Sequence, residues 1–162
     1  MIGAKYVRDI ENGEIVVITE SGMESIKPFK KIAERPCIFE RIYFASPDSI
    51  VGNKTVYTYR KALGEQLAIE NNIIADVVVP IPDSGVSAAI GFSQKSKIPF
   101  ELGIIRSHYV GRTFIEPSQT IRQFGVKLKH SVNRSCIENK KVILIDDSIV
   151  RGTTASKIVK MV

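Results

Sequence analysis

The stretch that most constrains the fold of this chain runs from Val142 to Thr154 and reads VILIDDSIVRGTT. An apolar, mostly β-branched run ends there in two adjacent carboxylates, Asp146 and Asp147. Such a run predicts a strand that is buried on both faces of a parallel sheet. Open α/β sheets bind their ligands at the carboxyl ends of the strands. We therefore expect the acidic pair to lie at a binding site.

The residues after the acidic pair predict an anion-binding turn. Gly152 permits a tight turn, and the hydroxyls of Ser148, Thr153 and Thr154 can donate hydrogen bonds. A helical pattern starts at Thr154, and the amide end of a helix favours an anion. Two carboxylates beside that turn suit Mg²⁺ or a hydroxyl-rich group. The combination predicts a phosphorylated sugar as the ligand rather than a bare phosphate.

Other phosphate-binding motifs are absent from the sequence. It contains neither the G-x-x-x-x-G-K-[ST] loop of nucleoside triphosphatases nor a G-x-G-x-x-G dinucleotide fingerprint after a strand. The plain alternative for residues 142–154 is a buried strand that ends in a solvated turn, and the length of the pattern favours the binding site.

Composition is that of a globular chain with one core. The 162 residues are 44% hydrophobic and 25% charged, and no apolar run approaches a membrane span. The charged N-terminal segment lacks the core of a signal peptide, so we expect a cytoplasmic location and no membrane partner. The net charge of +6 comes from dispersed basic residues, so we expect no nucleic-acid partner. Cys37 and Cys136 are too few for a disulfide framework and are expected to be reduced.

Strand and helix patterns alternate along the chain. This alternation predicts an α/β fold with a parallel sheet covered by helices on both faces. The expected strands are 14–18, 37–44, 76–82, 102–105 and 142–145, and the expected helices are 56–71, 86–94 and a segment that follows a polar loop at 106–118 and ends near Ser131.

The motif at 142–154 resembles the phosphoribosylpyrophosphate (PRPP) motif of type I phosphoribosyltransferases. Together with CIFERIYFASPDS, VVPIPDSGVSAAIGF and RSHYVGRTFIEPSQ, in that order, it resembles the phosphoribosyltransferase half of the glutamine PRPP amidotransferases. The resemblance covers essentially the whole chain. It implies a type I phosphoribosyltransferase fold truncated at the C-terminus, in which residues 1–35 are a remnant of the glutaminase (Ntn hydrolase-like) domain and residues 36–162 are an incomplete phosphoribosyltransferase domain.

The resemblance also implies an activity. The family forms 5-phosphoribosylamine and pyrophosphate from PRPP and glutamine-derived ammonia, the first step of de novo purine synthesis, and we expect the full-length protein to be a homo-oligomer. A glutaminase of this class uses an N-terminal cysteine, whereas residue 1 is Met, so we expect no glutamine hydrolysis. The alternative is a non-catalytic PRPP-sensing regulatory domain, which shares the motif. The absence of a helix-turn-helix pattern in residues 1–35 favours the enzyme.

Site roles follow from the same resemblance. The acidic pair would bind the ribose hydroxyls, the turn after it the 5-phosphate, and the 83–85 turn the pyrophosphate. Alone, Pro82-Asp83-Ser84-Gly85 would be a plain β-turn. The implied Mg²⁺ ligands are Ser84, Asp146 and Asp147. The implied PRPP-binding residues are Asp83, Ser84, Gly85, Asp146, Asp147, Ser148, Arg151, Gly152, Thr153 and Thr154.

The segment from Arg106 to Ser118 resembles the family's loop that closes over PRPP and completes an ammonia passage. It implies catalytic roles for Arg106, Tyr109 and Arg112. The usual family form Lys-Asn-Arg-Tyr is replaced by Arg106-Ser107-His108-Tyr109, which leaves the role of His108 open.

Cys37 admits two interpretations. Some family members carry a [4Fe-4S] cluster whose first ligand is the cysteine of this C-x-F-E segment, and a cluster usually needs four thiolates. Only Cys136 remains in the chain, at a position that matches no ligand. We therefore expect Cys37 to be a buried structural cysteine, with a cluster ligand in the full-length protein as the alternative.

Overall fold

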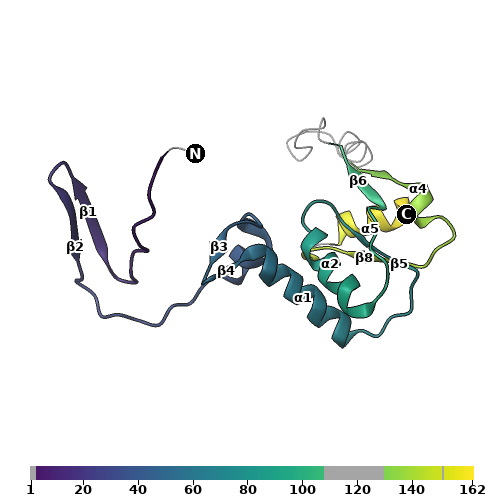
Figure 1. Cartoon of the computed structure of the whole chain (residues 1–162), viewed down its shortest axis with the longest axis horizontal. Coiled ribbons are helices and arrows are strands. Elements are labelled where there is room, and N and C mark those ends of the chain that lie inside the picture. The colour runs from purple at the N-terminus through teal and green to yellow at the C-terminus, as the bar shows by residue number, and fades with distance from the viewer. Residues whose placement is uncertain (1–2, 108–129, 151) are drawn as a thin grey trace. The chain divides into compact units, whose positions relative to one another are not determined.

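The computed structural model describes residues 3–107, 130–150 and 152–162, and the chain divides into two compact units, Met1–Cys37 and Ile38–Val162. The first unit contains one antiparallel hairpin of β1 (Ile15–Thr19) and β2 (Gly22–Ile26), drawn in purple in Figure 1. The strand predicted at 14–18 is confirmed, whereas β2 was not predicted because its sequence, GMESI, lacks an apolar alternation.

Glu14 closes the open end of this hairpin. Its carboxylate accepts hydrogen bonds from Arg8, from the Ser25 hydroxyl and from the Glu11 backbone N–H. These donors, Arg8 first, hold the pKa of Glu14 well below its usual range. The first unit is thus organised by polar contacts.

The second unit begins with a π-helical turn, η1 (Glu40–Phe44), followed by a short hairpin of β3 (Ile50–Val51) and β4 (Lys54–Thr55). The strand predicted at 37–44 is therefore wrong. The Ala45 N–H bonds back to the Glu40 carbonyl at 3.0 Å, and the carbonyls of Arg41 and Ala45 accept from Arg60. Because a helical turn and a side chain satisfy these backbone groups, the segment needs no neighbouring strand.

Helices α1 (Val56–Glu70) and α2 (Val86–Ser96) confirm the helices predicted at 56–71 and 86–94. They lie side by side in Figure 1 and touch backbone to backbone. A Cβ added at Gly64 would lie 1.9 Å from the Ala88 carbonyl oxygen, and one at Gly91 would lie 2.0 Å from that of Lys61. Glycine is therefore required at both positions.

Strand β5 (Val77–Pro80) pairs in parallel with β8 (Val142–Ile145), with Val77 opposite Val142, and Phe100 bridges the other side of β5. Both predicted strands are confirmed. All of β5 is buried, but β8 is half-buried until Ile145. The expected burial on both faces thus fails for most of β8, which within the described residues pairs with β5 alone.

Helices cover both faces of this sheet, as predicted. On one face Val77 and Val79 pack in a cluster with Ile137 of α4 (Arg134–Ile137) and Ile158 of α5 (Thr153–Met161). The other face packs against α2 through a cluster of Val78, Ala89, Phe92 and Ile145. The fold is therefore mixed α/β with a parallel pair at its centre.

A second strand pair, β6 (Ile104–Arg106) and β7 (His130–Val132), is antiparallel. The strand expected at 102–105 is present, but it runs from Ile104 to Arg106. The helix expected to end near Ser131 is wrong at its last two residues, because His130 and Ser131 pair with Arg106 and Ile105. Residues 108–129, which carry most of the predicted loop and helix, lie outside the described residues.

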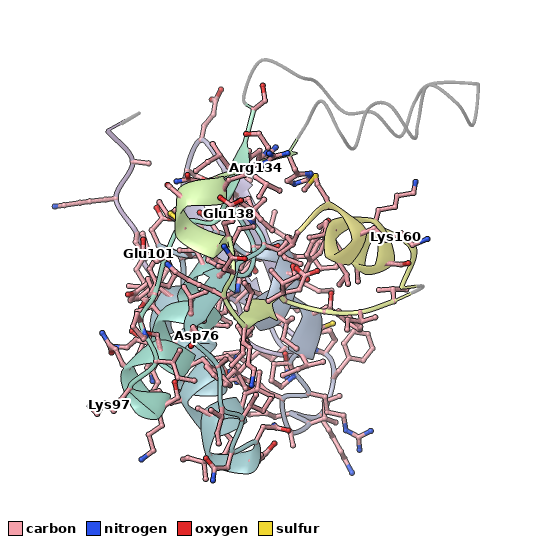
Figure 2. All side chains as sticks on the ribbon, turned by 90° about the vertical axis from the view of Figure 1, so that its right-hand side faces the viewer. Asp76, Lys97, Glu101, Arg134, Glu138 and Lys160 are labelled. Carbon is pink, nitrogen blue, oxygen red and sulfur yellow. The ribbon has the colours of Figure 1, made fainter. Side chains whose placement is uncertain are left out.

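The surface of the second unit carries charged side chains among exposed apolar ones. Figure 2 shows Lys97, which ends α2, and Lys160, on α5, with side chains that point outward. Within the described ranges, none of the helices combines the length and the apolar character that crossing a membrane requires.

Candidate functional site

The acidic pair and the 83–85 turn meet at one edge of the sheet. Ser84 follows β5 and Asp146 follows β8, 62 residues later in the sequence, and the Ser84 hydroxyl donates to Asp146 Oδ1 at 3.4 Å. The parallel pairing of β5 and β8 causes this meeting, because the carboxyl ends of parallel strands lie at the same edge. The structure thus brings together two segments that the sequence analysis singled out separately.

The two carboxylates differ in their surroundings. Asp146 Oδ1 also accepts the backbone N–H of Asp147 at 2.9 Å, while Asp147 Oδ1 accepts the Ser148 hydroxyl at 2.7 Å. Burial raises the pKa of Asp146, and the hydrogen bonds from Asp147 and Ser84 oppose this shift. Asp147 Oδ2 is buried, and no described residue offers it a hydrogen bond. A buried carboxylate oxygen without a donor suits a cation or a ligand hydroxyl.

The turn after β5 is tightly packed. The Ile81 N–H donates to the Ile145 carbonyl at 2.8 Å, and the Gly85 N–H donates to the Ile81 carbonyl at 2.9 Å. A Cβ at Gly85 would lie 2.2 Å from the Ile145 oxygen. Asp83, joined to Pro82 by a cis peptide bond, is exposed and forms an ion pair with Arg106. This turn is fixed to the strand that carries the acidic pair.

Among the described residues, the turn after β8 is open at Gly152. This residue has a φ of +68°, and no described atom would lie within 4 Å of a Cβ placed there. Ile149 and Val150 are 75% and 86% exposed. α5 follows at once, and the Ser156 N–H bonds to the Gly152 carbonyl at 2.8 Å. The turn thus leads into the amide end of a nine-residue helix, the arrangement that the sequence predicted for an anion.

A cavity of about 180 Å³ lies beside the acidic pair. One end is polar, and the rest is formed by apolar side chains and by the α1–α2 crossing. Its lining residues are Ile42, Arg60, Leu63, Gly64, Leu67, Ser84, Ala88, Asp146 and Asp147.

Sequence reasoning missed Arg60, which is only 7% exposed. Its spacing carried a signal, since the buried residues of α1 are Val56, Arg60 and Gly64, four positions apart. An arginine on the buried stripe of a helix needs partners, and it finds them in two backbone carbonyls.

Several predicted site residues are not placed with the rest. Tyr109, Arg112 and Arg151 lie outside the described residues, as does His108, and Thr153 and Thr154 are described only as the start of α5.

The expectation of a buried Cys37 is wrong, because its side chain is exposed. The π-helical turn that follows contributes no buried residue, so this segment offers no core for the thiol to join. The described residues contain no group of three or more His, Cys, Asp and Glu side chains that could hold a metal, and the whole chain has two cysteines. These residues do not fit a four-thiolate iron–sulfur cluster.

No family model matches the chain. Curated proteins of related sequence do match it, and those described below share one name. The amidophosphoribosyltransferase of Rhizobium etli is 61% identical over the whole chain, and that of Bacillus subtilis is 48% identical over 99% of it. The Arabidopsis thaliana protein named amidophosphoribosyltransferase 1, chloroplastic, is 53% identical over 99% of the chain.

Solved structures agree with the sequence relatives. The chain matches the glutamine PRPP amidotransferase of B. subtilis, solved with ADP and GMP, at a TM-score of 0.86 and 48% identity over 98% of its length. A structure described as the allosteric regulatory enzyme of purine biosynthesis matches at 0.87, also with 48% identity. The chain spans 28% to 34% of the length of these curated relatives. From this identity over its full length, the chain belongs to the amidophosphoribosyltransferase family.

Proposed function

We propose that this chain binds PRPP with Mg²⁺ and transfers its phosphoribosyl group to ammonia, forming 5-phosphoribosylamine and pyrophosphate. The observation that carries the proposal is the meeting of Ser84 with the acidic pair, in which the buried Oδ2 of Asp147 lacks a donor among the described residues. The open turn at Gly152 and the start of α5 lie directly after that pair in the chain.

The donor set suits Mg²⁺. Asp146, Asp147 and Ser84 offer hard oxygen atoms, and Mg²⁺ is usually held by one or two carboxylates together with substrate phosphates rather than by a full protein cage. The two-carboxylate site agrees with that preference. When bound, Mg²⁺ would neutralise negative charge on the leaving pyrophosphate.

In the proposed reaction the ammonia lone pair forms a bond to C1 of the ribose, and the bond from C1 to the pyrophosphate oxygen breaks. Asp146 and Asp147 hold the ribose hydroxyls, and Gly152, Thr153 and Thr154 with Ser148 and Arg151 hold the 5-phosphate. The Asp83–Gly85 turn contacts pyrophosphate, and Arg106, Tyr109 and Arg112 stabilise its growing charge. Arg106 supports this role, because its ion pair with Asp83 keeps a cation beside that turn.

The proposal extends to the N-terminal unit and to the longer protein. Residues 1–35 belong to a glutaminase domain that supplies ammonia in the longer protein, which is a homo-oligomer of the cytoplasm. The separate hairpin unit that ends at Cys37 supports this division.

Calorimetry on the wild type and on an Asp146→Asn/Asp147→Asn variant tests the binding site. Removing both charges should weaken Mg²⁺–PRPP binding at least about 100-fold, since each charge-assisted contact contributes roughly 1.5 to 3 kcal/mol. The matched control is Glu101→Gln/Glu138→Gln, which removes two exposed carboxylates labelled in Figure 2 and should leave the affinity unchanged. Equal affinity in all three folded proteins would contradict the assignment.

Pyrophosphate release with ammonium at alkaline pH tests the chemistry. Release that requires both PRPP and ammonium supports the transferase. Tight PRPP binding without release would indicate a PRPP-sensing domain instead.

A further inference from the structure

Arg60 joins two parts of the second unit. Its Nε and Nη2 donate to the carbonyl oxygens of Arg41 and Ala45, each at 2.9 Å, and these two residues lie in and directly after η1. The guanidinium therefore fastens the π-helical turn to α1. This contact is structural, and two neutral donors would suffice for it.

Arg60 also lines the cavity beside the acidic pair, and its charge attracts that of Asp147. Burial lowers the pKa of Arg60 and Asp147 opposes the shift, yet an arginine stays protonated in proteins. Among the ion pairs of the described residues, Arg60 forms none. The two carbonyl contacts and the attraction of Asp147 offset the cost of burying this charge, so a cation is held at the cavity of the acidic pair.

We propose that Arg60 is a positioning residue that makes the acidic pair select a metal bound to an anionic ligand over the bare metal. The proposal rests on the function proposed above. A fixed positive charge in the cavity repels a free divalent cation and attracts a polyphosphate. The net effect is to disfavour metal alone at the two carboxylates and to favour a metal that arrives with its phosphate ligand.

Two substitutions separate the charge from the hydrogen bonds. Arg60→Gln keeps an N–H donor for the carbonyls and removes the charge, whereas Arg60→Lys keeps the charge. Mn²⁺ alone, followed by its electron paramagnetic resonance signal, probes the bare cation, and calorimetry with Mg²⁺–PRPP probes the anionic ligand.

For Arg60→Gln we expect opposite changes, with Mn²⁺ bound about three- to tenfold more tightly and Mg²⁺–PRPP about three- to tenfold more weakly. Arg60→Lys keeps the charge but not the two-nitrogen donor geometry, so it should change both affinities less than Arg60→Gln does. The matched control is Arg41→Gln, which removes a guanidinium that stacks over Tyr59 and does not line the cavity. It should change neither affinity.

A purely structural Arg60 would give a different result. If Arg60→Gln weakens both ligands together, or changes neither while circular dichroism shows a folded protein, the inference is overturned. If the wild type binds no PRPP, the proposed function fails, and the Mn²⁺ arm still tests the effect of Arg60 on the carboxylates.

Discussion

Two turns, the one from β5 to α2 and the one from β8 to α5, leave the sheet at the same edge but are built in opposite ways. At the first, Ile81 and Gly85 are buried, and Gly85 has no room for a side chain. At the second, no described atom lies within 4 Å of a Cβ placed on Gly152, and Ile149 and Val150 are exposed. The first turn is fixed by packing, whereas Ile149 and Val150 of the second bury no side chain. Gly85 is therefore needed because a side chain would not fit, and Gly152 because its backbone has a positive φ.

Of the substitutions at the two turns, Gly85→Ala should cause the largest loss of stability. Its Cβ would overlap the Ile145 carbonyl, a backbone atom that cannot rotate away, so we expect a loss of about 3 kcal/mol or more in the free energy of unfolding. Urea unfolding followed by circular dichroism measures it.

Gly152→Ala is the matched control at the second turn. No described atom blocks the methyl group there, so the expected cost is that of the left-handed backbone, about 1 kcal/mol. Equal losses in the two variants would break the contrast between a packed turn and an open one.

A smaller effect is expected for Ile81→Val, which removes one methylene from a side chain that is 7% exposed. The loss should be about 1 kcal/mol. The same change at Ile149, which is 75% exposed, should cost nearly nothing. Thermal unfolding of both variants compares the turns directly, and a substantial loss for Ile149→Val would show that the second turn is packed as well.

A smaller effect than that of Ile81→Val is expected for Arg106→Gln, which breaks the ion pair with Asp83. The two side chains are 37% and 59% exposed, so solvent screens the pair and the loss should be about 0.5 kcal/mol. Unfolding at low and at high salt checks this, because the difference between wild type and variant should shrink as salt rises. A difference that persists in high salt would mean that Arg106 stabilises the turn by packing.

The features that the sequence predicted well have strong local signals. The apolar run of β5 and the run of β8 before the acidic pair marked the two central strands, and the turn residues after each marked the edge where Ser84 meets Asp146. The π-helical turn at 40–44 was missed because its alternating pattern imitates a strand, and its true partner, Arg60, lies on a later helix. The spacing of Val56, Arg60 and Gly64 placed Arg60 on the buried stripe of its helix, but its carbonyl partners and the exposure of Cys37 depend on tertiary contacts.

The parallel pairing of β5 with β8 has a consequence for the order of folding. Ser84 and Asp146 are 62 residues apart in the sequence, so a long loop must close before they can meet. Closing that loop costs conformational entropy before any contact between its ends stabilises it. The helix pair α1 and α2, joined by a short connection through β5, can form without that closure. A chain that has folded its helices but not docked β8 has no acidic pair at the sheet edge. The binding site therefore requires this long-range pairing, and ligand binding reports on the docking of β8 rather than on helix formation.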